Sequence, residues 1–227
     1  MHLVGKGIIK FHCIIWPAML LSAGLELPKA VVAHGHLNVA GTKISKSLGN
    51  AIDPLELAKQ YGTDAFRYLL LRDTPFGQDG EFSLERIEAQ YNADLANELG
   101  NLTQRVAAMA VKYLGGVLGK IPDHSHDVAS YHEAMQTQRF DKALEEVWLL
   151  VKGLNQYIEE EKPWQIAKTD VEHVSEILAY LVSNLLQISE LLVPFLPETA
   201  AKIKQTFAGN KVNSEVGILF PKQETEV

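Results

Sequence analysis

The sequence predicts a mainly α-helical protein, in which a partial α/β segment at the N-terminus is followed by an α-helical bundle. Short β-like runs alternate with one helix through the first fifty residues, whereas the later segments carry apolar residues at helical spacing. Of the 227 residues, 47% are hydrophobic and 22% are charged, which is the ordinary range for a globular protein. The composition therefore favours a folded chain over a disordered one.

Three segments make up the expected α/β part. "MHLVGKG" predicts a strand that ends in glycines, and "IIKFHCIIWPAMLLSAG" predicts a helix that stops at Gly24. "KAVVAHGHLNV" predicts a second strand, which leads into "GTKISKSLGN". One or two strands do not form a stable sheet by themselves, so we expect the chain to begin inside a larger α/β unit.

Helix signals begin at Asp53, which is followed by Pro54 and Glu56 in the order of an N-cap, a first-turn proline and an N3 acid. A long helix is predicted after Ser83, ending at Gly115, and its apolar stripe contains Ile87, Tyr91, Leu95, Leu99, Leu102, Val106, Met109 and Tyr113. The next predicted helix, which ends at Pro163, has a stripe of Phe140, Leu144, Val147, Trp148, Val151, Leu154 and Ile158.

A capping box of Thr169 and Glu172 predicts the start of another helix, whose apolar positions are Ile177, Leu181, Leu185 and Ile188. Pro194 and Pro197 predict a turn into a last short helix near residues 198–207. Because each of these amphipathic helices needs a partner for its apolar stripe, we expect residues 81–210 to form one bundle.

The charge and cysteine content restrict the classes of function. The net charge of −7 argues against indiscriminate binding of nucleic acid, although residues 1–80 hold 8 Lys and Arg against 6 Asp and Glu. Cys13 is the only cysteine, which excludes an internal disulfide and a cysteine-cluster zinc site and is typical of a cytoplasmic protein. No apolar run reaches the roughly 20 residues of a membrane span, so we expect no membrane partner.

The stretch "GTKISKSLGN" combines cations and hydroxyls between two glycines, at Lys43, Ser45, Lys46 and Ser47. A loop of this kind can surround a phosphate chain, and its ammonium groups can stabilise the charge that grows on departing pyrophosphate when ATP is attacked at its α-phosphate. A solvated basic turn would explain the same residues, since short motifs often match by chance.

The surrounding sequence resembles a known family. "HGHLNVAGTKISKSLGN", followed by "DPLELAKQYGTDAFRYLLL", resembles the KMSKS signature of class I aminoacyl-tRNA synthetases, with Ile44 in place of the usual methionine. "GKGIIKFHCIIWPAMLLSAG" and "NADLANELGNLTQR" resemble the methionyl-tRNA synthetase family in particular. The resemblance covers nearly the whole chain. It disfavours synthetases for leucine, valine or cysteine, which remain the alternative within the class.

The resemblance implies four regions. Residues 1–52 would be the C-terminal part of a Rossmann-like catalytic domain with its KMSKS loop, and 53–80 a helical connector that contacts the tRNA stem. Residues 81–210 would be the anticodon-binding bundle, and 211–227 a C-terminal tail. The implied activity is that of a methionine–tRNA ligase, which activates methionine with ATP and transfers it to tRNA(Met), with Mg²⁺ accompanying ATP and no metal bound by this chain.

The resemblance also implies roles for individual residues. Lys46 would contact the ATP phosphates, supported by Lys43, Ser45 and Ser47, while Gly5, Gly7 and Leu37 would approach the nucleotide. Phe11, His12 and Trp16 would line the methionine pocket, where aromatic edges and an imidazole N–H suit a thioether. Without the resemblance, His12 would be assigned to core packing.

For the anticodon, the resemblance implicates Asn101, Arg105 and Trp164. Asn101 and Arg105 are four residues apart beside the apolar stripe, so they can share one exposed patch, and Trp164 could stack on an unpaired base. From pattern alone, a polar helix shoulder and a buried tryptophan would be the simpler interpretations.

Two features depart from the family. The HIGH signature of the first half of the catalytic domain is absent, and Gly7 stands where the family has aspartate. We therefore expect a fragment or one half of a split enzyme, inactive by itself and completed by a separate N-terminal half. A tRNA-binding module without catalysis is the alternative outside the enzyme class.

Overall fold

The computed structural model describes residues 1–39, 42–43, 53–123, 126–207, 209, 211–213 and 217–223. It confirms a mainly helical protein with a short α/β segment at the N-terminus. Within the described residues the first part contains β1 (His2–Gly5), η1 (Lys6–Ile8), η2 (Phe11–Ile15), α1 (Trp16–Ser22), β2 (Val31–His34), β3 (Leu37–Val39) and β4 (Thr42–Lys43). The second part contains α2 (Pro54–Tyr61), α3 (Thr63–Asp73), β5 (Gly80–Phe82), α4 (Leu84–Gln90), η4 (Tyr91–Gly100), α5 (Asn101–Leu114), α6 (Ala129–Gln136), α7 (Phe140–Glu161), α8 (Pro163–Ile166), α9 (Val171–Leu192) and α10 (Pro197–Phe207).

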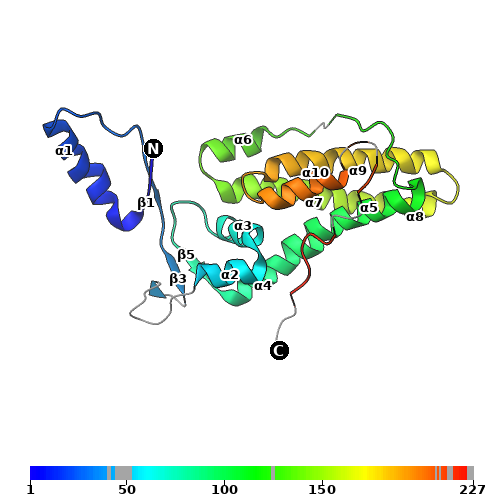
Figure 1. The fold of residues 1–227 in the computed structure, drawn as a ribbon, viewed down its shortest axis with the longest axis horizontal. Helices are drawn as coiled ribbons and strands as arrows, with labels where there is room; N and C mark the ends of the chain where they lie inside the picture. The colour runs from blue at the N-terminus through cyan, green and yellow to red at the C-terminus, as the bar shows by residue number, and fades with distance from the viewer. Residues whose placement is uncertain are drawn as a thin grey trace.

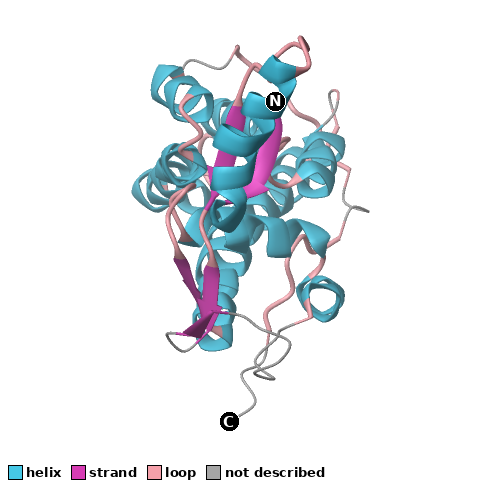
Figure 2. Ribbon diagram, turned by 90° about the vertical axis from the view of Figure 1, so that its left-hand side faces the viewer, coloured by secondary structure: helices cyan, strands magenta, loops and turns pink. Residues whose placement is uncertain are grey.

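The described strands form two small sheets rather than one (Figure 2). β1 pairs with β2 in parallel, and β3 pairs with β4 antiparallel and with β5 in parallel. The single strand expected over "KAVVAHGHLNV" is wrong, because the chain changes partner at Gly35. A Cβ atom there would lie 1.7 Å from the carbonyl oxygen of Gln78, and the next backbone N–H, of His36, donates to Asp79.

Helices α4, η4 and α5 form one continuous helical run along the lower side of the bundle in Figure 1, and α1 stands apart at the other end of the molecule. The apolar stripe predicted for this run is buried except at Tyr113, which is half-buried. Gly115 ends it with a positive φ of 62°, a conformation that glycine adopts without strain. Residues 91–100 have π-helical hydrogen bonding, which the sequence did not indicate.

Of two predicted helix starts, the structure confirms the first and contradicts the second. Asp53 caps α2 by accepting a hydrogen bond from the N–H of Leu55 at 2.8 Å. For α9 the cap is Asp170, which accepts from the N–H of His173 at 2.9 Å, whereas the hydroxyl of Thr169 donates backwards to the carbonyl of Ile166. The capping box expected at Thr169 is therefore wrong by one residue.

One contiguous core joins the bundle to the connector. It runs from Leu57 and Tyr68 through Leu95 and Trp148 to Phe207. α6, which no apolar stripe had indicated, is attached by a hydrogen bond from Tyr131 Oη to the carbonyl of Leu191. Within the N-terminal residues 1–34, by contrast, Val4 is the single buried hydrophobic side chain.

Candidate functional site

The two glycines expected near the nucleotide lie against two histidines. A Cβ on Gly5 would meet the His34 ring at 3.6 Å, and one on Gly7 would meet the His36 ring at 3.5 Å, both ordinary contact distances. Leu37, the next residue, opens β3 and is 40% exposed. The structure therefore brings Gly5, Gly7 and Leu37 to one junction, where β2 passes into β3.

An ion pair closes this junction from the connector side. Lys6 pairs with Asp79, whose other oxygen accepts the His36 backbone N–H at 2.7 Å. The hydrogen bond from Lys6, and then that from His36, lowers the pKa of the Asp79 carboxyl below its ordinary value. Asp79 was missed at the sequence level because it lies more than seventy residues from Lys6, and no local pattern connects them.

Two of the three residues expected in the methionine pocket meet on one helix face. The His12 Nδ1–H donates to the Ile8 carbonyl oxygen at 3.1 Å, and the His12 and Trp16 rings meet edge to face with centroids 6.1 Å apart. In a neutral imidazole this bond places the proton on Nδ1, so Nε2 carries no proton and can accept a hydrogen bond. Phe11 lies on the same helix but is 56% exposed.

The helical run from η1 through η2 to α1 leaves a large apolar surface uncovered. Its exposed hydrophobic side chains, which we call the open face, are Ile8, Ile9, Phe11, Ile14, Ile15, Met19 and Leu21. An apolar patch of this density marks a surface that binds another apolar surface. In Figure 1 the helix stands clear of the bundle, and the exposure of these side chains shows that the described residues of this chain leave the open face largely uncovered.

We call residues 41–50, which contain the two lysines and the two serines with expected catalytic roles, the lysine loop. Lys43 ends β4, and its backbone pairs with that of Asn38 in β3. Ser45, Lys46 and Ser47 lie outside the described residues, so their expected roles stay predictions.

The bundle brings together polar groups from two helices. Arg105 on α5 forms an ion pair with Glu159 on α7 at 2.6 Å, and Lys152 on α7 lies 3.8 Å from Glu98 on η4. Asn155 Nδ2 donates to the Glu98 carbonyl oxygen at 3.5 Å. We call this strip the polar seam; its members are Glu98, Asn101, Arg105, Lys152, Asn155 and Glu159.

Sequence reasoning found Asn101 and Arg105 but missed Glu159, the partner of Arg105, and the Lys152–Glu98 pair. The spacing of 98, 101 and 105 on one helix equals the spacing of 152, 155 and 159 on the other, so each set lies on one helix face. That match was visible in the sequence, but pairing the two faces required the tertiary structure. Trp164, on α8 (Pro163–Ile166), is half-buried and packs against the core, so only part of its ring is open to a base.

Glu98 is unusual within the seam. One of its carboxylate oxygens is buried without a hydrogen-bond partner among the described residues. Burial raises the pKa of its carboxyl above the ordinary value, while Lys152 acts in the opposite direction. Its partner Lys152 is 59% exposed and so presents a positive charge on the surface.

Among the described residues, no group of three or more His, Cys, Asp or Glu side chains is arranged to hold a metal ion. In the same part of the chain, no helix has the length and apolar character needed to cross a membrane.

Two family descriptions match the chain in succession. "tRNA synthetases class I (M)" matches residues 1–107, and "Anticodon binding domain of methionyl tRNA ligase" matches residues 118–216. The class that these α/β and helical parts define is therefore that of the class I aminoacyl-tRNA synthetases.

Relatives specify the family within this class. The chain is 42% identical to a methionine–tRNA ligase of Thermotoga maritima and 46% identical to that of Caldanaerobacter subterraneus subsp. tengcongensis, each over 89% of the chain and 34% of the relative. A crystal structure of Mycobacterium tuberculosis methionyl-tRNA synthetase bound by methionyl-adenylate has a TM-score of 0.84 and 34% identity, covering 97% of this chain and 49% of that one. This chain belongs to the methionyl-tRNA synthetase family, and it spans about a third of the length of these curated relatives.

Proposed function

We propose that this chain is the C-terminal portion of a methionine–tRNA ligase, which activates methionine with ATP and transfers it to tRNA(Met). The observation that carries the proposal is the likeness, over 97% of the chain, to a synthetase whose structure holds methionyl-adenylate. This chain would contribute to two steps, the activation of methionine and the recognition of the tRNA. Its N-terminal segment would contribute the lysine loop, and its bundle would bind the anticodon.

For the first step, Lys46 would stabilise the departing pyrophosphate, supported by Lys43, Ser45 and Ser47. Gly5, Gly7 and Leu37 would line the approach of the nucleotide, a role supported by their common position at the β2–β3 junction. Mg²⁺ would enter with ATP, bound through its phosphates.

Methionine would be held by His12, Phe11 and Trp16. The hydrogen bond from His12 to Ile8 orients the imidazole, and the edge of Trp16 offers a polarisable surface to the thioether. At Gly7 a side chain would find room beside His36, so the aspartate of the family would fit there without displacing backbone.

For the second step, Asn101, Arg105 and Trp164 would bind the CAU anticodon. Arg105 is held by a single exposed carboxylate, which it can exchange for a base edge, and Asn101 is exposed and open to a base. A base could stack on the open part of Trp164.

The open face supports a partner in the catalytic part. A second polypeptide segment that supplies further parallel strands and helices, such as the N-terminal half of a related enzyme, would bury it and extend the β1–β2 pair. A purely tRNA-binding module would have no use for an apolar surface at this distance from the bundle, and this observation favours the ligase.

The test is methionine-dependent ATP–pyrophosphate exchange. We expect no exchange from the 227-residue chain alone, and exchange when the N-terminal half of a related enzyme is added. Exchange by the chain alone, or none in the mixture although the two halves form a complex, would contradict the proposal.

A further inference from the structure

Asn155 occupies the middle of the polar seam, and no family resemblance assigned it a role. We infer that Asn155 is a further specificity-determining residue of the RNA-binding surface, whose side-chain oxygen accepts a hydrogen bond from the exocyclic amino group of an unpaired base. The inference rests on the proposed function, because it names a new contact within the same anticodon surface.

Backbone carbonyls fix the orientation of the Asn155 amide. Its Nδ2 lies 3.2 Å from the carbonyl oxygen of Val151 and 3.5 Å from that of Glu98. Turning the amide by half a rotation would place Oδ1 against these two oxygens, which cannot donate. The nitrogen therefore faces the two helices, and the oxygen is held on the other side.

That oxygen is left without a protein partner. Asn155 is half-buried, and in the described part of the chain no donor bonds its Oδ1. The Asn155 Oδ1 atom is also not fully buried, whereas one carboxylate oxygen of Glu98 is buried without a partner. An acceptor that is oriented in advance loses little conformational entropy when a ligand donates to it.

The charges beside the amide are two ion pairs. Lys152, one helical turn before Asn155, pairs with Glu98, and Arg105 pairs with Glu159 one turn after it. Because ion pairs at a surface are weak, each cation can exchange its carboxylate for a nucleotide group. Lys152 can contact a phosphate beside the base, while the Asn155 amide and Arg105 contact base edges.

The chemistry of an acceptor selects between bases. Cytosine and adenine carry an exocyclic amino group at the edge where uracil and guanine carry a carbonyl oxygen, and two facing acceptors repel. CAU contains both a cytosine and an adenine, so the Asn155 oxygen would favour it over anticodons with uracil or guanine at the contacted position.

The experiment uses the full chain and labelled anticodon stem-loops at fixed salt. Each loop carries CAU or a version in which the cytosine or the adenine lacks only its amino group, and each is titrated against the parent and Asn155→Ala. Gln156→Ala is the matched control, because Gln156 is an exposed amide on the next residue that donates to Glu160 at 2.7 Å rather than to the seam.

We expect Asn155→Ala to weaken CAU binding by about 3- to 10-fold, the effect of one lost hydrogen bond. Removing one of the two amino groups should weaken binding to the parent by a similar factor and leave binding to Asn155→Ala unchanged, because the two changes remove the same contact. Gln156→Ala should bind like the parent.

Two results would overturn the inference. The first is that Asn155→Ala still binds both amino-deleted loops more weakly than the CAU loop, by the same factors as the parent. The other, which does not depend on the folding of any variant, is a parent that prefers CAU to changed anticodons yet binds the amino-deleted loops equally well. A parent with no anticodon preference would instead refute the proposed function, and this inference with it.

Discussion

Arg105 is paired before any RNA is present, since Glu159 holds its guanidinium at 2.6 Å. The carboxylate is 60% exposed, and exposed ion pairs contribute only about 0 to 1 kcal/mol. Exchanging this partner for a base edge therefore costs little. Within the proposed function, Glu159 orients the fork of Arg105 without locking it.

Arg105→Ala should reduce the preference for a CAU stem-loop over one with a changed anticodon, because base-edge contacts carry discrimination and phosphate contacts do not. Titration of both stem-loops measures the ratio of dissociation constants. Arg86→Ala is the control, since it removes a positive charge paired with Asp73, outside the seam. An unchanged ratio in Arg105→Ala would remove Arg105 from the recognition surface.

Trp164→Ala should weaken stem-loop binding by roughly 1 to 3 kcal/mol through lost stacking, irrespective of base identity. Because Trp164 also packs against the core, thermal unfolding of the variant must be measured beside the titration. A loss of stability with unchanged affinity would assign Trp164 to packing alone.

Lys46→Ala, in a complex completed by an N-terminal half, should slow methionyl-adenylate formation by roughly 3 to 4 kcal/mol in activation free energy and leave methionine affinity nearly unchanged. The ammonium would act chiefly on charge that develops in the transition state. Lys29→Ala removes an exposed cation from the same segment and serves as control. Equal rates for Lys46→Ala and the parent would end the catalytic assignment.

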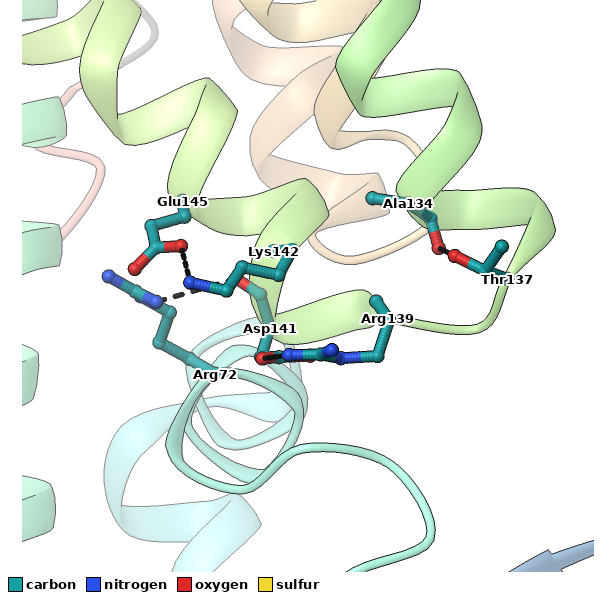
Figure 3. Close-up of polar contacts among 7 residues, drawn as sticks. All are labelled: Arg72, Ala134, Thr137, Arg139, Asp141, Lys142 and Glu145. Carbon is teal, nitrogen blue, oxygen red and sulfur yellow. Dashed lines mark hydrogen bonds and ion pairs between the residues drawn. The ribbon is translucent and has the colours of Figure 1, made fainter.

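At the scale of the helices, the first turns of α7 and α9 each depend on one aspartate. Asp141 follows Arg139, which donates to its carboxylate from Nε at 3.1 Å and from the terminal nitrogen at 2.9 Å (Figure 3). Arg72 from α3 bonds the Asp141 carbonyl at 3.4 Å and so ties the connector to α7. Lys142 and Glu145 form a further ion pair on the same turn.

The hydrogen bond from Arg139 lowers the pKa of the Asp141 carboxyl below its ordinary value. A carboxyl whose pKa falls on folding stabilises the protein above its unfolded pKa of about 3.9 and loses that contribution as the pH falls through the folded value. Denaturant unfolding should therefore show a steeper loss of stability below about pH 4 in the parent than in Asp141→Asn. Parallel pH profiles would contradict this.

Asp170→Ala should destabilise the chain by about 1 kcal/mol through loss of the N-cap of α9, whereas Thr169→Ala should change stability little. Denaturant midpoints of the two variants measure the difference. The opposite order would restore Thr169 as the cap.

The whole molecule consists of a well-packed helical part and an N-terminal segment that leaves its apolar side uncovered. The bundle and connector share one core, whereas η2 and α1 expose their large hydrophobic side chains. Within the proposed function, the bundle is expected to bind RNA by itself, whereas catalysis would require a partner that covers the open face.

Replacing Ile14 with Lys and Met19 with Glu, both more than 60% exposed, should reduce aggregation of the isolated chain, because charge disrupts apolar association. The same double variant should lose exchange activity with an added N-terminal half, since charges would be buried at the contact. Light scattering and exchange measure the two effects. The control makes the same two replacements, Lys for Val171 and Glu for Val193, at exposed positions of the bundle.

The sequence alone determined most of the elements, and it predicted the class of site. The stripe from Ile87 to Tyr113, the cap at Asp53 and the stop at Gly115 depend on spacing within one segment, and all three are confirmed. The lysine loop and the Asn101–Arg105 pair were likewise visible as local patterns.

The tertiary structure decided the features that join distant segments. Gly35 splits the expected strand because the Gln78 backbone lies against it, and Asn155 and Glu159 meet Glu98 and Arg105 because two helices pack in one particular register. Helical periodicity determines which residues share a face, but the partner of that face depends on how the whole core packs. Contacts between residues more than fifty positions apart, which create the polar seam, therefore came from the fold.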